Sequence, residues 1–188
     1  MSKYTCEKLK KILLDSSEDK KLKISKEIGY PVFLRMCFGE ELQHIVPILQ
    51  DGAAAIIVNE KGQVLLQDRK DNDKWGLPGG CQELGDTFEQ TICREIKEET
   101  NLDVEEKDLS LITVVSGQTR RNSYPNGDIV FNNTVLYLVT KYSGKLKVND
   151  NESKKLKWFD IDNLPKHQND PDLIEAYKSK ILSKRLNN

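Results

Sequence analysis

The sequence is poor in the residues that build covalent or thiolate frameworks. Its 188 residues include four cysteines and two histidines. The cysteines show neither metal-ligand spacing nor the dense pattern of a disulfide-stapled domain. This usage favours reduced thiols in a cytoplasmic protein.

Long apolar runs and an excess of one charge are also missing. No apolar stretch approaches the ~20 residues that a membrane helix needs, and the first eight residues lack the apolar core of a signal peptide. We therefore expect a cytoplasmic location and no membrane partner. With 29 basic and 30 acidic residues, the net charge of -1 gives no field to gather a nucleic-acid polymer. A nucleotide substrate, which needs only a local site, is not excluded.

Length and composition predict one main domain with an appendage. We assign residues 1–50 to an N-terminal helical or accessory segment and residues 51–188 to the main domain. Lysine, glutamate and spaced apolar residues indicate short amphipathic helices in residues 3–27. The more apolar residues 31–49 fit either strands or an interface. The segment suits a dimerisation arm, a lid or a partner-binding arm, so a homodimer is one possible state.

The main domain mixes strands and helices. Residues 53–58 and 64–66 flank a turn and predict a β-hairpin. The capping box at 87–90 predicts a helix that runs to about Asn101. The remaining predicted elements are strands at 109–115, 129–140 and 156–161, a turn at 124–128, and a helix at 171–186. The fold class is therefore α/β or α+β.

The helix after Thr87 places acids where an amphipathic helix should be apolar. Its apolar stripe consists of Phe88, Ile92 and Ile96. Glu95 and Glu99 fall within or beside this stripe, and Glu98 lies farther round. A carboxylate that faces a core costs several kcal/mol unless its charge is compensated. The helix C-terminus also disfavours anions, so a hard divalent cation would relieve both conflicts.

Two plainer interpretations apply when each feature is taken alone. The three glutamates fit a solvated face on which Arg94 and Lys97 are their partners. The preceding Pro78-Gly79-Gly80 fits an ordinary turn, although two glycines also let the backbone approach a metal or a phosphate closely.

Loop and helix together resemble the Nudix box, Gly-x5-Glu-x7-Arg-Glu-apolar-x-Glu-Glu-x-Gly-apolar. The matching positions are Gly80, Asp86, Arg94, Glu95, Ile96, Glu98, Glu99, Asn101 and Leu102. The spacing is intact across Gly80–Leu102. Asp86 replaces glutamate but keeps the charge that pairs with the box arginine in the family. Asn101 replaces glycine and is the best other residue for a left-handed helix end.

This resemblance to the Nudix hydrolase family implies an α/β/α sandwich with a mixed β-sheet. It also implies Mg²⁺ or Mn²⁺ held by Glu95, Glu98, Glu99 and the carbonyl of Gly79. Arg94 would orient Glu95 through an ion pair, and Glu95 would serve as a ligand, a general base or both.

Other candidate residues lie outside the box. Some family members draw a further acid from the loop before the late tryptophan strand, and Glu152 resembles that placement. The alternative is an exposed acid balanced by the lysines that follow it. Asp150, two residues earlier, is expected to be silent. Arg120 and Tyr124 are candidates for substrate binding. The alternatives are that Arg120 belongs to a solvated pair of arginines and that Tyr124 packs in the core.

The resemblance implies a small-molecule nucleotide as the substrate. We expect cleavage of a phosphoanhydride in a nucleoside diphosphate linked to another moiety, of the ADP-ribose, nucleotide-sugar or dinucleoside-polyphosphate class. One alternative is a nucleoside triphosphate pyrophosphatase. Another is a non-catalytic nucleotide-binding module, although the box keeps an acid at every acidic position.

Overall fold

The structure of the protein is a computed structural model. It describes the backbone of residues 11, 17, 20, 48–123 and 129–186. Within the two long segments, side chains are described for residues 49–123 and 129–179.

Ten strands and two long helices follow one another along the described chain. The strands are β1 Ile48–Ile57, β2 Gln63–Arg69, β3 Trp75–Gly76, β4 Gly79–Cys81, β5 Leu102–Asp103, β6 Leu109–Val115, β7 Arg121–Ser123, β8 Ile129–Val139, β9 Ser143–Gly144 and β10 Ser153–Asp160. The helices are α4 Phe88–Thr100 and α5 Pro171–Leu186, with short 3-10 turns η1 Glu106–Asp108 and η2 Gln118–Arg120. The helices predicted at 87–101 and 171–186 are confirmed to within one residue at each end, whereas those predicted in residues 3–27 fall almost entirely outside the described residues.

The central sheet has the strand order β4-β1-β8-β6 and is mixed. Strand β1 is antiparallel to β4, and β6 is antiparallel to β8. Strands β1 and β8 run the same way. Near their starts the Asn133 side chain donates to Asp51 Oδ1 at 2.9 Å, and at their ends Val58 N donates to Val139 O at 2.9 Å. Because β1 pairs with β4, the start of β1 and the glycines of β4 lie at the same end of the sheet.

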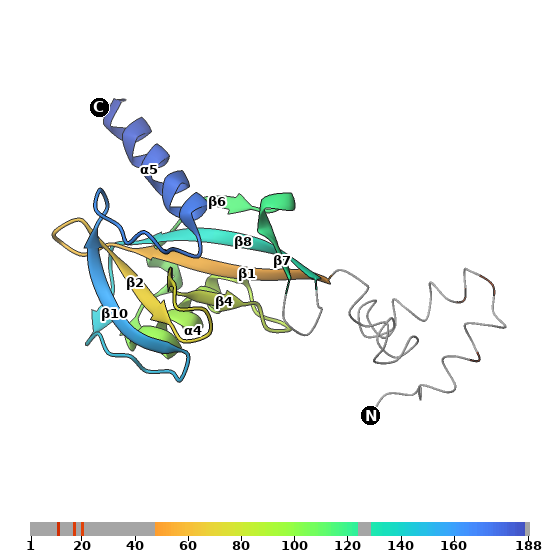
Figure 1. The fold of residues 1–188 in the computed structure, drawn as a ribbon. Helices are drawn as coiled ribbons and strands as arrows, with labels where there is room; N and C mark the ends of the chain where they lie inside the picture. Colours follow the sequence, from red (N-terminus) through yellow and green to blue (C-terminus); the bar gives the residue numbers. More distant parts are fainter. Residues whose placement is uncertain (1–10, 12–16, 18–19, 21–47, 124–128, 187–188) are drawn as a thin grey trace. The chain divides into compact units, whose positions relative to one another are not determined.

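The central strands are buried on both faces, and each face meets a different helix (Figure 1). Successive strand residues point to opposite faces, so neighbouring residues of β1 join different clusters. The cluster under α4 contains Ala53, Ala55, Ile57, Leu65, Ile92, Ile96, Leu102, Val135, Tyr137 and Val139. The cluster under α5 contains Ala54, Ile56, Val64, Leu66, Leu77, Leu136, Leu173, Ile174 and Tyr177. The α/β/α sandwich predicted from the resemblance is confirmed.

The predicted hairpin of β1 and β2 is only partly correct. The turn forms, because Asn59 Oδ1 accepts hydrogen bonds from the backbone N–H groups of Lys61 and Gln63. A single bridge joins Val58 to Val64. Beyond it the strands part, since β1 pairs with β4 and β8 whereas β2 pairs with β10 and β3.

The predicted strands at 109–115 and 129–140 are confirmed as β6 and β8. Between them the sequence analysis missed η2 and β7, and β7 is antiparallel to β8. The predicted turn at 124–128 lies outside the described residues. Strand β10 begins three residues before the predicted 156.

The chain divides into two compact units. One comprises Met1–Leu49 with Gln118–Phe131, and the other comprises Gln50–Gly117 with Asn132–Asn188. The assignment of residues 1–50 as an accessory segment stays a prediction, because most of them lie outside the described part. Within that part, neither long helix has the length and hydropathy of a membrane span.

Candidate active site

Helix α4 begins and ends where its capping residues predict. Thr87 Oγ1 accepts a hydrogen bond from Gln90 N at 3.1 Å, and Thr87 N donates to Gln90 Oε1 at 3.0 Å. At the other end, Asn101 takes a left-handed backbone with a φ of 61°, and its N–H donates to Lys97 O. The two caps fix the length of the helix and the face on which each glutamate lies.

The three box glutamates differ in exposure, as their spacing predicts. Glu99 is 4% exposed, and the side chain of Glu95 is 15% exposed. The side chain of Glu98 is 57% exposed. Glu95 and Glu99 therefore lie beside the fully buried Ile92 and Ile96, and Glu98 faces solvent. The solvated-face interpretation fits Glu98 and fails for Glu99.

Two neutral donors hold the buried Glu99 carboxylate. Gln67 Nε2 donates to Oε1 at 2.9 Å, and the Gly79 N–H donates to Oε2 at 2.8 Å. Burial raises the pKa of Glu99 to about 8, because these hydrogen bonds only partly offset the lost hydration. A proton or a cation beside this carboxylate would therefore be stabilising.

The backbone before α4 approaches its neighbours closely at both glycines of β4. Gly79 has a φ of +150°, and a Cβ there would lie 2.3 Å from Ala53 O. A Cβ on Gly80 would lie 2.5 Å from the carboxylate carbon of Glu95. The backbone of Gly80 thus packs directly on that carboxylate, which an ordinary turn would not require.

Arg94 gathers the acids around the loop and the helix. Its Nη1 lies 2.8 Å from Glu95 Oε1 and 3.3 Å from Glu98 Oε2. Its Nη2 donates to Cys81 O at 3.1 Å, and its Nε lies 3.5 Å from Asp86 Oδ2. The ion pair between Arg94 and Glu95 expected from the resemblance is present. Asp86 also reaches the arginine, at a distance that fits its shorter side chain.

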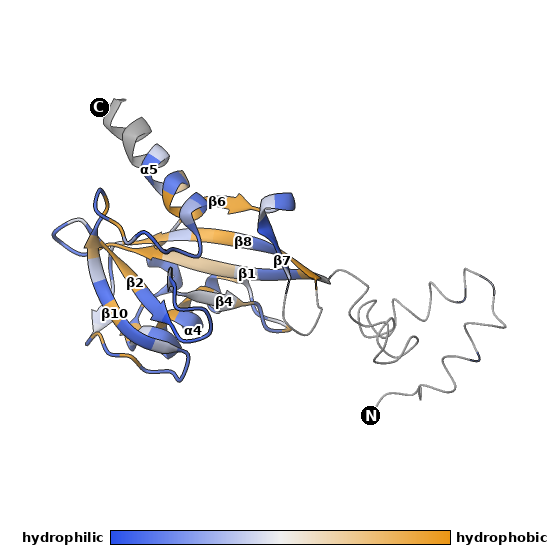
Figure 2. Ribbon diagram, in the orientation of Figure 1, coloured by the Kyte–Doolittle hydropathy of each residue, from blue (hydrophilic) through white to orange (hydrophobic). Residues whose placement is uncertain are grey.

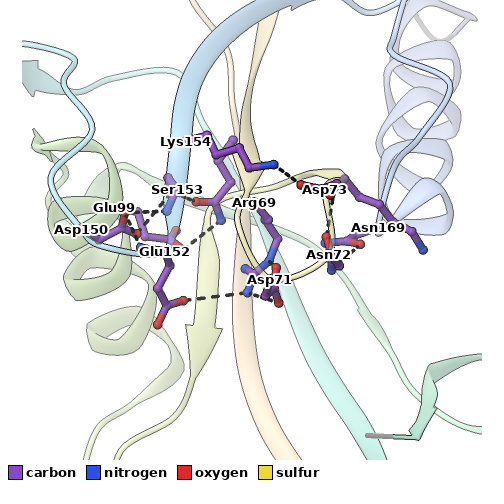
Figure 3. Close-up of polar contacts among 12 residues, drawn as sticks. Arg69, Asp71, Asn72, Asp73, Glu99, Asp150, Glu152, Ser153, Lys154 and Asn169 are labelled. Carbon is purple, nitrogen blue, oxygen red and sulfur yellow. Dashed lines mark hydrogen bonds and ion pairs between the residues drawn. The ribbon is translucent and has the colours of Figure 1, made fainter. Parts of the chain in front are cut away.

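Glu152 lies in the loop before β10, beside Arg69 at the end of β2 (Figure 3). Its side chain is 72% exposed, and Oε2 lies 3.9 Å from Arg69 Nη2. The Arg69 guanidinium also makes two hydrogen bonds with Asp71, at 3.0 and 3.1 Å. Lys154 pairs instead with Asp73. The acid is therefore accessible, and its ionic partner is an arginine that the sequence analysis did not single out.

Asp150 makes hydrogen bonds within the loop that carries Glu152, and its expected silence stays a prediction. Its Oδ1 accepts hydrogen bonds from Glu152 N at 3.2 Å and from Ser153 N at 2.9 Å. Its Oδ2 lies 3.3 Å from Ser153 Oγ. Asp150 therefore caps the loop that carries Glu152.

The structure does not place either of the two predicted substrate-binding residues relative to this site. Tyr124 lies outside the described residues, and Arg120 belongs to η2 in the other compact unit. Their substrate roles stay predictions.

Sequence reasoning also missed Gln67 and Ser153, which lie near the buried Glu99. After Gln63, strand β2 has an apolar run of three residues, and Gln67 follows that run directly. Figure 2 shows that the strand passes from hydrophobic to hydrophilic residues. A glutamine that directly follows an apolar run within a strand is the one sequence signal that would have drawn attention to this position.

The acids of α4 suit a hard divalent cation, although they are not gathered as a ready-made site. Among the described residues, no group of three or more His, Cys, Asp or Glu side chains is arranged so that it could hold a metal ion. Arg94 Nη1 lies between the carboxylates of Glu95 and Glu98. A cation held by both would require them to turn from the arginine. The donors are all carboxylate oxygens near one helix end, which is the chemistry that Mg²⁺ prefers.

Comparisons with known proteins agree with this geometry. The NUDIX domain family matches residues 48–179. An ADP-ribose pyrophosphatase of Methanocaldococcus jannaschii is 37% identical over 113 residues, which are 58% of this chain and 62% of that protein. The match thus spans less than two thirds of that relative. A MutT-like protein of Streptomyces ambofaciens is 30% identical over 136 residues, which are 72% of this chain and 77% of that protein.

A solved structure shows the same fold at similar identity. The crystal structure of a MutT NUDIX hydrolase from Burkholderia pseudomallei has a TM-score of 0.58 and 30% sequence identity. The match covers 68% of this chain and 97% of that one. The family match spans well over half of the chain, and its limits include the whole loop, helix α4 and Glu152. The chain therefore belongs to the NUDIX domain family, the Nudix hydrolases.

Proposed function

We propose that this Nudix hydrolase is a metal-dependent pyrophosphohydrolase that uses Mg²⁺ or Mn²⁺. Its substrate would be a nucleoside diphosphate linked to another moiety. The observation that carries the proposal is the pair of buried or half-buried carboxylates, Glu95 and Glu99, on which the backbone of Gly79 and Gly80 packs. Such a cluster is costly for a fold alone and useful for binding a cation.

Glu95, Glu98 and Glu99 are the proposed ligands, with the carbonyl of Gly79 as a fourth. When bound, the cation would neutralise the pyrophosphate and lower the pKa of a bound water. Gly79 would have two roles, because its carbonyl would bind the cation and its N–H donates to the Glu99 carboxylate. Both hydrogen-bond partners of Glu99 are neutral, so a cation that displaces its proton would balance the charge of the buried carboxylate.

Arg94 is the proposed positioning residue for Glu95. It fastens Glu95 to the loop, since the same guanidinium donates to Cys81 O. Two acids are candidates for the general base. Glu95 is half-buried and held, whereas Glu152 is exposed and has Arg69 as its one ionic partner among the described residues. Arg120 and Tyr124 remain proposed substrate contacts.

The relatives point to two classes of substrate. The M. jannaschii protein is described as an ADP-ribose pyrophosphatase, which supports a nucleoside diphosphate linked to another moiety here. The second candidate is a nucleoside triphosphate pyrophosphatase, which a Bacillus subtilis relative described as a putative 8-oxo-dGTP diphosphatase favours. The two differ in products, because only triphosphates would release inorganic pyrophosphate.

The test is a substrate panel with purified full-length protein and Mg²⁺ or Mn²⁺. The panel spans ADP-ribose, nucleotide sugars, dinucleoside polyphosphates, coenzyme A, NADH and nucleoside triphosphates, with products identified by chromatography. We expect a nucleoside monophosphate as one product and no turnover in excess EDTA. Undiminished turnover in EDTA would overturn the metal mechanism. Binding without hydrolysis across the panel would support a nucleotide-binding module instead.

A further inference from the structure

Gln67 links the buried Glu99 to a second part of the chain. The residue is 1% exposed and lies on β2. Its Nε2 donates to Glu99 Oε1 at 2.9 Å and to Leu77 O at 3.3 Å. Its Oε1 lies 2.7 Å from Ser153 Oγ, and Ser153 is 2% exposed. Every polar atom of the Gln67 side chain thus has a partner in a dry environment.

The chemistry of these groups fixes the direction of each hydrogen bond. The Leu77 carbonyl can only accept, so the amide nitrogen of Gln67 must face it, and the same nitrogen then donates to Glu99 Oε1. The amide oxygen must then face Ser153 and accept from its hydroxyl at 2.7 Å, whereas Asp150 Oδ2 lies farther from the same hydroxyl, at 3.3 Å. The order Ser153 to Gln67 to Glu99 therefore follows from the donor and acceptor types and from the shorter of the two distances, without an observed hydrogen.

The far end of this chain of bonds is the loop that carries Glu152. Ser153 pairs with Arg69 in the β-ladder, at a shift in register before Lys155. Asp150 accepts from the N–H groups of both Glu152 and Ser153, and Lys70 N donates to Glu152 O at 2.8 Å. Glu152 and Ser153 are thus tied to the last residue of β2 and to the residue that follows it. Figure 3 shows Arg69, Asp150, Glu152 and Ser153 side by side.

We propose that Gln67 and Ser153 are positioning residues that set the orientation of the Glu99 carboxylate and tie it to the loop bearing Glu152. The inference rests on the proposed function, since it takes Glu99 as a ligand. Because both carboxylate oxygens accept from fixed donors, the carboxylate cannot rotate about its terminal bond without breaking two hydrogen bonds. A fixed carboxylate loses little freedom when it binds a cation, so its affinity is higher than that of a free one.

The first test is Gln67→Met, which keeps the length of the side chain and removes both amide functions. Its matched control is Gln63→Met. Gln63 lies four residues earlier on the same strand and also donates to a carboxylate, Asp160 Oδ1, at 3.1 Å. Mn²⁺ binding to each purified protein is measured by electron paramagnetic resonance, without substrate. We expect Gln67→Met to weaken Mn²⁺ binding by at least about tenfold and Gln63→Met to leave it unchanged.

The second test separates the hydroxyl from the fold. Ser153→Ala removes the donor to Gln67, and Ser153→Thr keeps it. We expect Ser153→Ala to weaken Mn²⁺ binding by about threefold to tenfold and Ser153→Thr to restore most of it. Melting temperatures in EDTA are recorded for every variant. A merely structural role would lower these temperatures without changing the Mn²⁺ affinity of the folded protein.

Each outcome decides between distinct conclusions. Wild-type protein that binds no Mn²⁺ would overturn the proposed metal site and this inference with it. Normal Mn²⁺ binding in wild type, Gln67→Met and Ser153→Ala alike would overturn the positioning role and leave the proposed function standing. Equal weakening in Gln67→Met and Gln63→Met would also overturn it. If Gln67→Met fails to fold, the pair of Ser153 variants tests the positioning role, and equal Mn²⁺ affinities in that pair would count against it.

Discussion

The two faces of the central sheet bury different kinds of side chain. Under α5, the described helix residues that join the core are Leu173, Ile174 and Tyr177. Under α4, the layer also buries a carboxylate, Glu99, together with the polar Gln67 that bonds to it. Both faces belong to one sheet, and both gain stability from apolar contact.

The difference separates what the fold needs from what the site needs. The α5 face shows that this sheet can be covered by apolar contact, so the polar layer under α4 is no requirement of the architecture. A layer that gives up apolar contact and buries a charge departs from local consistency, and such departures mark function. Changes under α4 should therefore alter activity, and changes under α5 should alter stability.

The largest expected effect comes from Glu98, the exposed acid of the α4 end. Glu98→Gln keeps the shape and removes the charge. We expect a loss on the order of a thousandfold in kcat, or about 4 kcal/mol of transition-state stabilisation, because a cation would be held less well. The melting temperature in EDTA should be equal or higher, because like charges are relieved and the exposed pair with Arg94 contributes little. A near-normal rate at saturating Mg²⁺ would indicate that Glu98 is a residue of a solvated face and not a metal ligand.

The second prediction tests the buried charge under α4 through pH. The pKa of Glu99 is about 8 in the folded protein, against an ordinary value of 4.5. A carboxyl with a raised folded pKa binds its proton more tightly when folded. Its contribution to stability is therefore complete below about pH 4.5 and is lost as the pH rises to about 8. Between pH 5 and pH 9 in EDTA, wild type should lose roughly 3 to 5 kcal/mol more than Glu99→Gln. Urea unfolding measures this difference, and equal losses in both proteins would contradict it.

The third prediction addresses the other face. Leu173 is 1% exposed under α5, and Leu173→Ala should lower the free energy of unfolding by roughly 2 to 5 kcal/mol because it leaves a cavity. The kcat of the folded protein should remain within about twofold of wild type, because the residue joins the core cluster on the face opposite α4. Urea titration and steady-state kinetics at a temperature where the variant is folded check both parts. A large fall in kcat would erase the functional distinction between the faces.

The smallest expected effect is at Glu152. If it serves the reaction, Glu152→Gln should lower kcat by about tenfold or more with little change in stability, because an exposed loop residue contributes little packing. The control is Glu60→Gln, an exposed glutamate in the turn between β1 and β2. Steady-state rates compared across the two variants give the result. Equal and negligible effects would leave Glu95 as the better candidate for the general base.

The local features of the site were predictable from the sequence. The caps of α4 and the burial of Glu99 follow from patterns within a few residues of each other. The parting of β1 and β2 was not predictable, because a turn signal indicates that the chain reverses and does not say which strands will pair afterwards. The contacts of Gln67 were also hidden, since its partners Glu99 and Ser153 lie 32 and 86 positions away.

The same long separations bear on how the protein folds. Helix α4 is capped by its own neighbours, so it can begin to form from local contacts alone. The Gln67–Ser153 bond requires β10 to dock on β2 and to close a loop of 86 residues, a step with a large entropic cost. An intermediate without docked β10 would carry the Nudix helix and lack the Ser153 support of Gln67. Recovery of high-affinity Mn²⁺ binding during refolding should therefore lag behind the recovery of helical circular dichroism.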